Sequence, residues 1–106
     1  MKKILFVCLG NICRSPMAEY IFNNIAAKNG IRAHAESAGT SGWHNGEYMH
    51  CGTAEILDGM GIDSHTFTSR KIKPADLATY DYIIVMDDSN LADVEKLFGR
   101  QPEKIF

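Results

Sequence analysis

The feature that most constrains the fold is a short, continuously apolar segment that leads through a glycine-containing loop into a helical pattern. This segment, residues 3–8, reads Lys-Ile-Leu-Phe-Val-Cys. Such a run is typical of a strand that is buried on both faces. A second run of this kind, Tyr-Ile-Ile-Val-Met, occupies residues 82–86. Helical patterns alternate with these runs, so the order predicts an α/β fold with a mostly parallel sheet and helices on both faces.

The expected strands share an apolar character and alternate with loops or helices. They cover residues 3–8, 31–37 and 82–86, and a further strand begins at residues 104–106. In parallel sheets, ligands bind at the carboxyl ends of the strands. The loops at residues 8–15 and 87–90 both follow strands, so we expect them to meet at the functional edge of the sheet.

The expected helices begin and end at recognisable residues. The first has Ser15 as its N-cap and Pro16 at the first helical position, and Asn29-Gly30 closes it. The second covers about residues 51–60, and a short turn follows Pro74 within an otherwise irregular segment. The last helix is expected to have Asn90 as its cap and to stop at Gly99.

The composition excludes several classes of function. The chain has 106 residues, the length of one domain, and 11 Lys and Arg against 13 Asp and Glu give a net charge of −2. This balance argues against a nucleic-acid surface, and the longest apolar run is far below the ~20 residues that span a membrane. Three cysteines are too few for a disulfide scaffold, so we expect a cytoplasmic protein. Its expected oligomeric state is a monomer or a weak dimer.

The segment from Cys8 to Ser15 carries the chemistry. It places a cysteine at the end of a strand, then five residues, then Arg14 and a helix N-terminus. Backbone N–H groups in such a loop form an anion site, and Gly10 and Asn11 tolerate the unusual φ that a tight loop needs. Arg14 offers a planar fork for two phosphate oxygens, and the positive environment stabilises the Cys8 thiolate.

Other interpretations of this segment are weaker. Cys8 could be a small buried apolar residue, and Arg14 a solvated side chain at a helix end. A Walker-type nucleotide loop is excluded because no Gly-Lys-Ser/Thr follows. A zinc site is disfavoured because the three cysteines and four histidines form no close ligand pair of the usual spacing.

Residues 8–19 closely resemble the signature of the low-molecular-weight protein tyrosine phosphatases, and they read Cys-Leu-Gly-Asn-Ile-Cys-Arg-Ser-Pro-Met-Ala-Glu. Further matches follow in order at residues 37–40, 42–43, 69–70 and 81–90. The resemblance covers the whole chain and implies a single low-molecular-weight phosphatase-like domain over residues 1–106. It also implies a flavodoxin-like, doubly wound parallel sheet of about four strands.

The resemblance implies a role for most residues of the loop. Cys8 is the nucleophile, Arg14 the phosphate clamp and Ser15 the partner of the thiolate. Substrate contacts are implied for the remaining loop residues and for an aromatic wall, namely Leu9, Gly10, Asn11, Ile12, Cys13 and Trp43. Neither a metal nor a cofactor is implied. Cys13 is the natural disulfide partner of Cys8 on oxidation, which would make the protein redox-sensitive.

Ile12 is the bulky apolar form expected of tyrosine-directed members, whereas arginine-directed members carry a Thr there. Arsenate reductases of this fold need a later cysteine pair, and no cysteine follows Cys51. Cys51 is expected to be structural, and His65 lies near a position where the family often has a supporting histidine, without the usual spacing to Arg70. The expected substrates are phosphotyrosine-containing proteins or small aryl phosphates.

The Asp-Pro loop that carries the family's general acid has no counterpart, because the three prolines follow Ser15, Lys73 and Gln101. We therefore expect a C-terminally shortened member that lacks the last helix and has slowed turnover. The alternatives are a catalytically impaired module that binds phosphotyrosine or oxyanions, and a protein-arginine phosphatase. Asp87 and Asp88 are expected to position their loop rather than to act as the acid.

Overall fold

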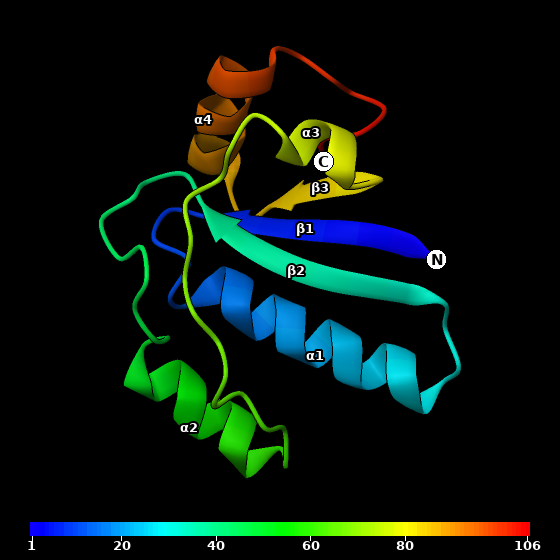
Figure 1. Cartoon of the computed structure of the whole chain (residues 1–106), viewed down its shortest axis with the longest axis vertical. Coiled ribbons are helices and arrows are strands. Elements are labelled where there is room, and N and C mark those ends of the chain that lie inside the picture. Colours follow the sequence, from blue (N-terminus) through cyan, green and yellow to red (C-terminus); the bar gives the residue numbers. More distant parts are fainter.

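Strand β1 lies at the centre of the sheet, with one parallel strand on each side (Figure 1). The computed structural model describes residues 1–106. Strand β1 (Lys2–Cys8) pairs with β2 (Ala33–Gly39) and with β3 (Tyr82–Val85), so the strand order is β2-β1-β3. The α/β fold with a parallel sheet is therefore confirmed. Strand β2 begins two residues later than the expected range of 31–37.

The expected fourth strand is present only as an isolated bridge. Ile105 pairs in parallel with Ile83 of β3, and the backbone N–H of Phe106 donates to the carbonyl of Ile83 at 2.9 Å. The sheet thus has three strands and a bridge beside β3, where about four strands were expected. Residues 104–106 supply one bridge rather than the consecutive pairs that make a ladder.

Helices cover both faces of the sheet. Helix α1 (Arg14–Lys28) lies along one face, and α2 (Cys51–Gly59) lies beyond it (Figure 1). The short α3 (Asp76–Thr79) and α4 (Asp88–Phe98) lie on the opposite side. None of these helices has the length and apolar composition that crossing a membrane requires.

Two apolar clusters hold the layers together. The cluster between the sheet and α4 includes fully buried side chains from three elements, namely Leu5, Val7, Ile83 and Val94. The cluster that joins α1 and α2 consists of Met49, Leu57, Ile62 and Phe67, with residues of α1 packed against it. Each such side chain contributes about 1.5–3 kcal/mol through burial. The two clusters therefore fix α1 and α4 relative to the edge of the sheet where β1 ends.

The start of α1 differs from the expectation. The helix begins at Arg14, its N-cap residue is Cys13, and no side chain caps it. The expected cap, Ser15, lies inside the helix because its hydroxyl bonds with the side chains of Cys8 and Asn11 instead. A side chain that serves the loop cannot also cap the helix.

The start of α4 is also corrected, whereas the helix ends are confirmed. The carboxylate of Asp87, not Asn90, caps α4 by accepting the backbone N–H of Asn90 at 2.8 Å. Gly99 ends this helix with a φ of 75°, and Asn29 is the C-cap of α1. The expected turn after Pro74 is α3.

Candidate active site

The loop between β1 and α1 curls into a cradle, here defined as residues 8–15. Cys8 is the last residue of β1 and its side chain is buried. Asn11, in the middle of the cradle, has a φ of 56°, in the left-handed region that asparagine tolerates better than most residues. The expectation of an unusual φ is thus confirmed for Asn11 and wrong for Gly10, whose φ is not positive.

Two glycines let neighbouring segments approach the cradle closely. A Cβ on Gly10 would lie 3.0 Å from Cδ2 of His44, and this close approach explains the glycine. A Cβ on Gly39, the last residue of β2, would lie only 2.8 Å from the carbonyl oxygen of Leu9. Strand β2 can therefore reach the cradle only because position 39 has no side chain.

The thiol of Cys8 is surrounded by hydrogen-bonding groups. Its Sγ lies 3.0 Å from the hydroxyl oxygen of Ser15 and 3.3 Å from the backbone N–H of Asn11, which donates to it. None of the backbone N–H groups of Leu9, Gly10, Ile12 and Cys13 donates to a protein acceptor. Unpaired N–H groups at a helix N-terminus provide donors and a positive potential for an anion.

The side chain of Asn11 ties the cradle to two other parts of the chain. Its Nδ2 donates to the hydroxyls of Ser15 and Ser37, each at 2.9 Å, and its Oδ1 accepts the backbone N–H of Arg70 at 2.9 Å. Asn11 is fully buried, and all these hydrogen-bonding groups are satisfied. Ser37 and Arg70 lie in the matched segments 37–40 and 69–70, but no role was expected for either residue.

The guanidinium of Arg14 lies at the cradle and pairs with the loop after β3. Its Nη1 donates to Oδ2 of Asp87 at 2.8 Å, and both side chains are about half exposed. The backbone N–H of Asn90 and the Arg14 guanidinium hold the pKa of Asp87 below its usual range. The pKa of Arg14 is raised in turn by the hydrogen bond to Asp87. The expectation that the two loops meet at one edge of the sheet is confirmed.

The segment after β2 forms a rim beside the cradle. The backbone N–H of Ser41 donates to the carbonyl of Leu9 at 2.9 Å, and the ring of His44 lies against Gly10. Trp43, between them, is 76% exposed, and Leu9 is 43% exposed. The side chain of Trp43 is thus available to a ligand.

The other thiols lie at the same end of the molecule. Cys13 is exposed, and its Sγ accepts the hydroxyl of Thr53 at 3.5 Å. Cys51 is exposed at the start of α2. All three cysteines are free, so the disulfide between Cys8 and Cys13 stays a prediction.

His65 bonds to Asp63, and both side chains are largely exposed. Phe67, two residues after His65, is buried against Tyr20, and no role is assigned to His65. No group of three or more His, Cys, Asp or Glu side chains is placed to hold a metal ion.

A family model described as low molecular weight phosphotyrosine protein phosphatase matches residues 3–106. The chain belongs to this family. It is 48% identical over 101 residues to the low molecular weight protein-tyrosine-phosphatase YfkJ of Bacillus subtilis. It is 42% identical over 98 residues to the low molecular weight phosphotyrosine protein phosphatase of Homo sapiens.

These alignments cover most of this chain and less of the relatives. The Bacillus alignment covers 93% of this chain and 65% of the relative, and the human one covers 90% and 61%. The chain thus spans less than two thirds of the length of these curated relatives.

Solved structures of other proteins share this fold. The crystal structure of YfkJ superimposes with a TM-score of 0.95 at 46% identity, covering 99% of this chain and 68% of that one. A Drosophila arginine phosphatase superimposes with a TM-score of 0.89 at 34% identity, covering 99% and 69%. The flavodoxin-like winding expected for the family is consistent with these superpositions.

Proposed function

We propose that the chain is a protein tyrosine phosphatase that hydrolyses phosphotyrosine through a phosphocysteine intermediate on Cys8. The observation that carries this proposal is the cradle. There, Sγ of Cys8 lies beside Ser15 and within a loop of unpaired backbone N–H groups at the start of α1. A nucleophile and an anion site can then act on the same phosphorus atom. The names of the relatives support the same chemistry.

The reaction has two steps. Sγ of Cys8 attacks phosphorus, the bond from phosphorus to the tyrosyl oxygen breaks, and the departing phenolate takes up a proton. Water then attacks the phosphocysteine, the S–P bond breaks, and inorganic phosphate and the Cys8 thiolate are released. The hydroxyl of Ser15, 3.0 Å from Sγ, can donate to that thiolate. Neither step requires a metal or an organic cofactor.

Arg14 and the backbone N–H groups bind the phosphoryl oxygens. Phosphate binding replaces the half-exposed ion pair between Arg14 and Asp87 with a bidentate contact to two phosphoryl oxygens. The substrate ring then packs against Trp43 and Leu9 on the rim. Ile12 favours phosphotyrosine over phosphoarginine as the substrate.

The three free thiols support a reducing, cytoplasmic location.

Replacement of the nucleophile tests the proposal. Cys8→Ser should reduce turnover of para-nitrophenyl phosphate to background, because a hydroxyl is a much weaker nucleophile than a thiolate at neutral pH. Cys51→Ser is the matched control, since Cys51 lies outside the cradle and is exposed. A rapid quench should trap phosphate on Cys8 in the parent chain and none in the Cys8→Ser variant. Substantial turnover by Cys8→Ser would refute the assignment.

Leaving-group dependence tests whether the 106-residue chain supplies its own general acid. Asp87 has a lowered pKa, so it is ionised at neutral pH and has no proton to donate. A positioned acid contributes about 10²–10⁴ in rate, mostly for poor leaving groups such as tyrosine, whose pKa is near ~10. We expect kcat/KM, which reports formation of the phosphocysteine, to fall steeply across aryl phosphates as the leaving-group pKa rises. A flat dependence of kcat/KM would show that a residue of this chain donates the proton.

A second candidate function is binding without efficient turnover. It is favoured by the ionised state of Asp87, because the cradle can hold an oxyanion whether or not an acid is present. Vanadate or phosphate should bind without any divalent ion, as measured by calorimetry. Tight binding of vanadate or phosphate, together with turnover of every aryl phosphate no faster than background, would favour a binding function over catalysis. Faster release of phosphate from phosphoarginine than from phosphotyrosine would instead favour an arginine phosphatase.

A further inference from the structure

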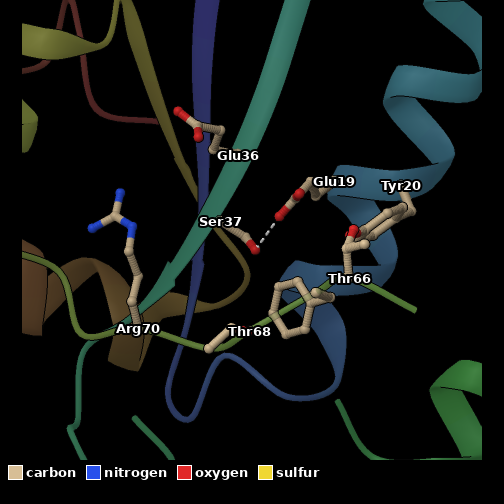
Figure 2. A pocket seen from close by; sticks show the side chains of 8 residues that line it. Glu19, Tyr20, Glu36, Ser37, Thr66, Thr68 and Arg70 are labelled. Atoms are coloured by element: carbon tan, nitrogen blue, oxygen red, sulfur yellow. Dashed lines mark hydrogen bonds between the residues drawn. The ribbon is translucent and has the colours of Figure 1, made fainter. Parts of the chain in front are cut away.

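A polar cavity of about 200 Å³ lies behind the cradle, between α1, β2 and the segment that precedes Arg70. Figure 2 shows Glu19 on α1 and Ser37 on β2 pointing toward one another inside it, with a hydrogen bond between them. Glu36 and Arg70 lie on the other side of Ser37 in the same view. The proposed chemistry at Cys8 does not use this cavity directly.

One hydrogen-bonded chain connects the cavity to the thiol of Cys8. The hydroxyl of Ser37 donates to Oε1 of Glu19 at 2.5 Å, and Ser37 accepts from Nδ2 of Asn11 at 2.9 Å. The second hydrogen of the same Nδ2 goes to the hydroxyl oxygen of Ser15, also at 2.9 Å. Ser15 in turn lies 3.0 Å from Sγ of Cys8. The chain therefore begins at a carboxylate and ends at the nucleophile.

The direction of each bond follows from the inventory of donors and acceptors. Glu19 accepts the hydrogen of Ser37, so Ser37 can present only lone pairs to Asn11. Asn11 must then turn its NH₂ group toward both hydroxyls, and its Oδ1 toward the N–H of Arg70. Because Ser15 already accepts from Asn11, its own hydrogen is free to donate to Cys8 Sγ. An acceptor at Glu19 thus orients the hydroxyl beside the thiol.

The network returns to the helix on which it starts. Ser15 and Glu19 are four residues apart on α1, one helical turn, so they lie on the same face. Asn11 and Ser37 bridge them through the cradle and β2. A displacement of Glu19 would therefore change the hydrogen bonding of the Ser15 hydroxyl.

Stability alone does not account for a carboxylate at this position. Arg70, the nearby cation, donates its guanidinium hydrogens to Asp76 and Tyr80 rather than to Glu19. Burial raises the pKa of Glu19 to about 7, and the charge of Glu36 acts in the same direction. The hydrogen bond from Ser37 and the charge of Arg70 lower this pKa, but by less. An ionised Glu19 therefore disfavours the folded state, which suggests that it is present for another reason.

We propose that Glu19 is a positioning residue for the reaction at Cys8: its Oε1 fixes Ser37 and Asn11 so that the Ser15 hydroxyl donates to the thiolate. The inference rests on the proposed function and assigns that reaction a residue remote from the substrate. It requires an acceptor at position 19, whereas the charge is secondary.

Two variants separate the acceptor from the charge. Glu19→Gln removes the charge and keeps an acceptor oxygen, whereas Glu19→Met removes both and fills similar space. At neutral pH, alkylation of Cys8 by iodoacetamide should be about tenfold slower in Glu19→Met than in Glu19→Gln, the equivalent of one lost hydrogen bond. Peptide mass spectrometry assigns the alkylated cysteine. Vanadate affinity should fall in the same order, and kcat should change more than KM.

A second comparison keeps the test decisive if Glu19→Met fails to fold. The Ser37→Ala substitution already breaks the chain of hydrogen bonds, so in that background Glu19→Gln and Glu19→Ser should have the same rate of Cys8 alkylation. In the parent background, alkylation of Cys8 should be slower in Glu19→Ser than in Glu19→Gln, because the serine side chain is too short to bond to Ser37. In the parent background, equal alkylation rates and vanadate affinities for Glu19→Gln and for a variant that cannot bond to Ser37, either Glu19→Met or the shorter Glu19→Ser, would overturn the inference. These readouts need no turnover, so their outcome is independent of the Cys8→Ser test of the proposed function.

Discussion

The guanidinium of Arg14 has two competing partners, the Asp87 carboxylate in the structure and the phosphoryl oxygens in the proposed reaction. Exposed ion pairs contribute little to stability, so exchange of the partner is easy. Asp87→Asn keeps an acceptor for the N–H of Asn90 and so preserves the cap of α4, but it removes the competing charge. We expect the affinity for inorganic phosphate, measured by calorimetry, to rise by up to about fivefold. A weaker affinity would mean that Asp87 organises Arg14 for binding instead.

The residues of the cradle could be predicted from the sequence, whereas their supports could not. Cys8, Arg14 and Ser15 lie within one short segment whose spacing predicts an anion site. Ser37 reaches Asn11 across 26 positions, and Arg70 reaches it across 59. Such contacts arise only when parallel strands align, and no local pattern records them.

At the scale of elements, the end of β2 is fitted to the cradle by the missing side chain at position 39. Gly39→Ala would place a Cβ 2.8 Å from the carbonyl oxygen of Leu9, so strand and loop must separate. We expect the free energy of unfolding to fall by about 1–3 kcal/mol, as for other overpacked sites, and vanadate affinity to fall with it. Urea denaturation and calorimetry measure the two quantities.

Gly30→Ala is the matched control for Gly39→Ala. Gly30 has a φ of +63° and no atom within 4 Å of an added Cβ, so only the backbone is strained. Alanine in that conformation costs about 1–2 kcal/mol, without an effect on the cradle. Equal losses of vanadate affinity in the two variants would show that the effect of Gly39→Ala is not local.

The sequence predicts most helices and strands, but it assigns the wrong helix N-caps where a capping side chain also bonds at the cradle. The apolar runs and the glycines that end helices fix the strands and the helix C-termini. Both expected N-caps are wrong for a related reason, because Ser15 bonds within the cradle and Asp87 takes the place of Asn90 at the loop beside Arg14. Capping residues and site residues are chemically the same, so the sequence cannot assign them to one role.

At the scale of the whole molecule, the sheet separates two kinds of interior. The apolar cluster with α4 supplies stability, whereas the region between β2 and α1 contains a polar cavity with two glutamates and one arginine. On the side of α3 and α4, Asp76 is fully buried in its pair with Arg70, and Tyr80, a member of the apolar cluster, donates to Glu36 at 2.5 Å. Arg70 and Glu36 of the cavity are therefore held by hydrogen bonds from both sides of β2, and Glu19 is the group of the cavity whose protonation changes near neutral pH.

The pH dependence of stability follows from that group. Burial raises the pKa of Glu19 from 4.5 to about 7, so the folded protein holds this proton more tightly than the unfolded chain does. The stability that Glu19 contributes is fully present below pH 4.5, falls as the pH rises, and is lost above about 7. The loss should be roughly 2–3 kcal/mol after allowance for partial exposure.

Urea denaturation across this pH range, with Glu19→Gln as the reference, measures the effect. Asp63, Asp81 and Asp87 have lowered pKa values, so their contributions are lost only at a more acidic pH and are common to both proteins. The difference in unfolding free energy between parent and variant should therefore change between pH 4.5 and 7 and stay constant on either side. Glu19→Gln should be the more stable protein at alkaline pH, because it keeps the bond to Ser37 without burying a charge. A difference that is constant across the whole range would show that Glu19 ionises as an exposed carboxyl does.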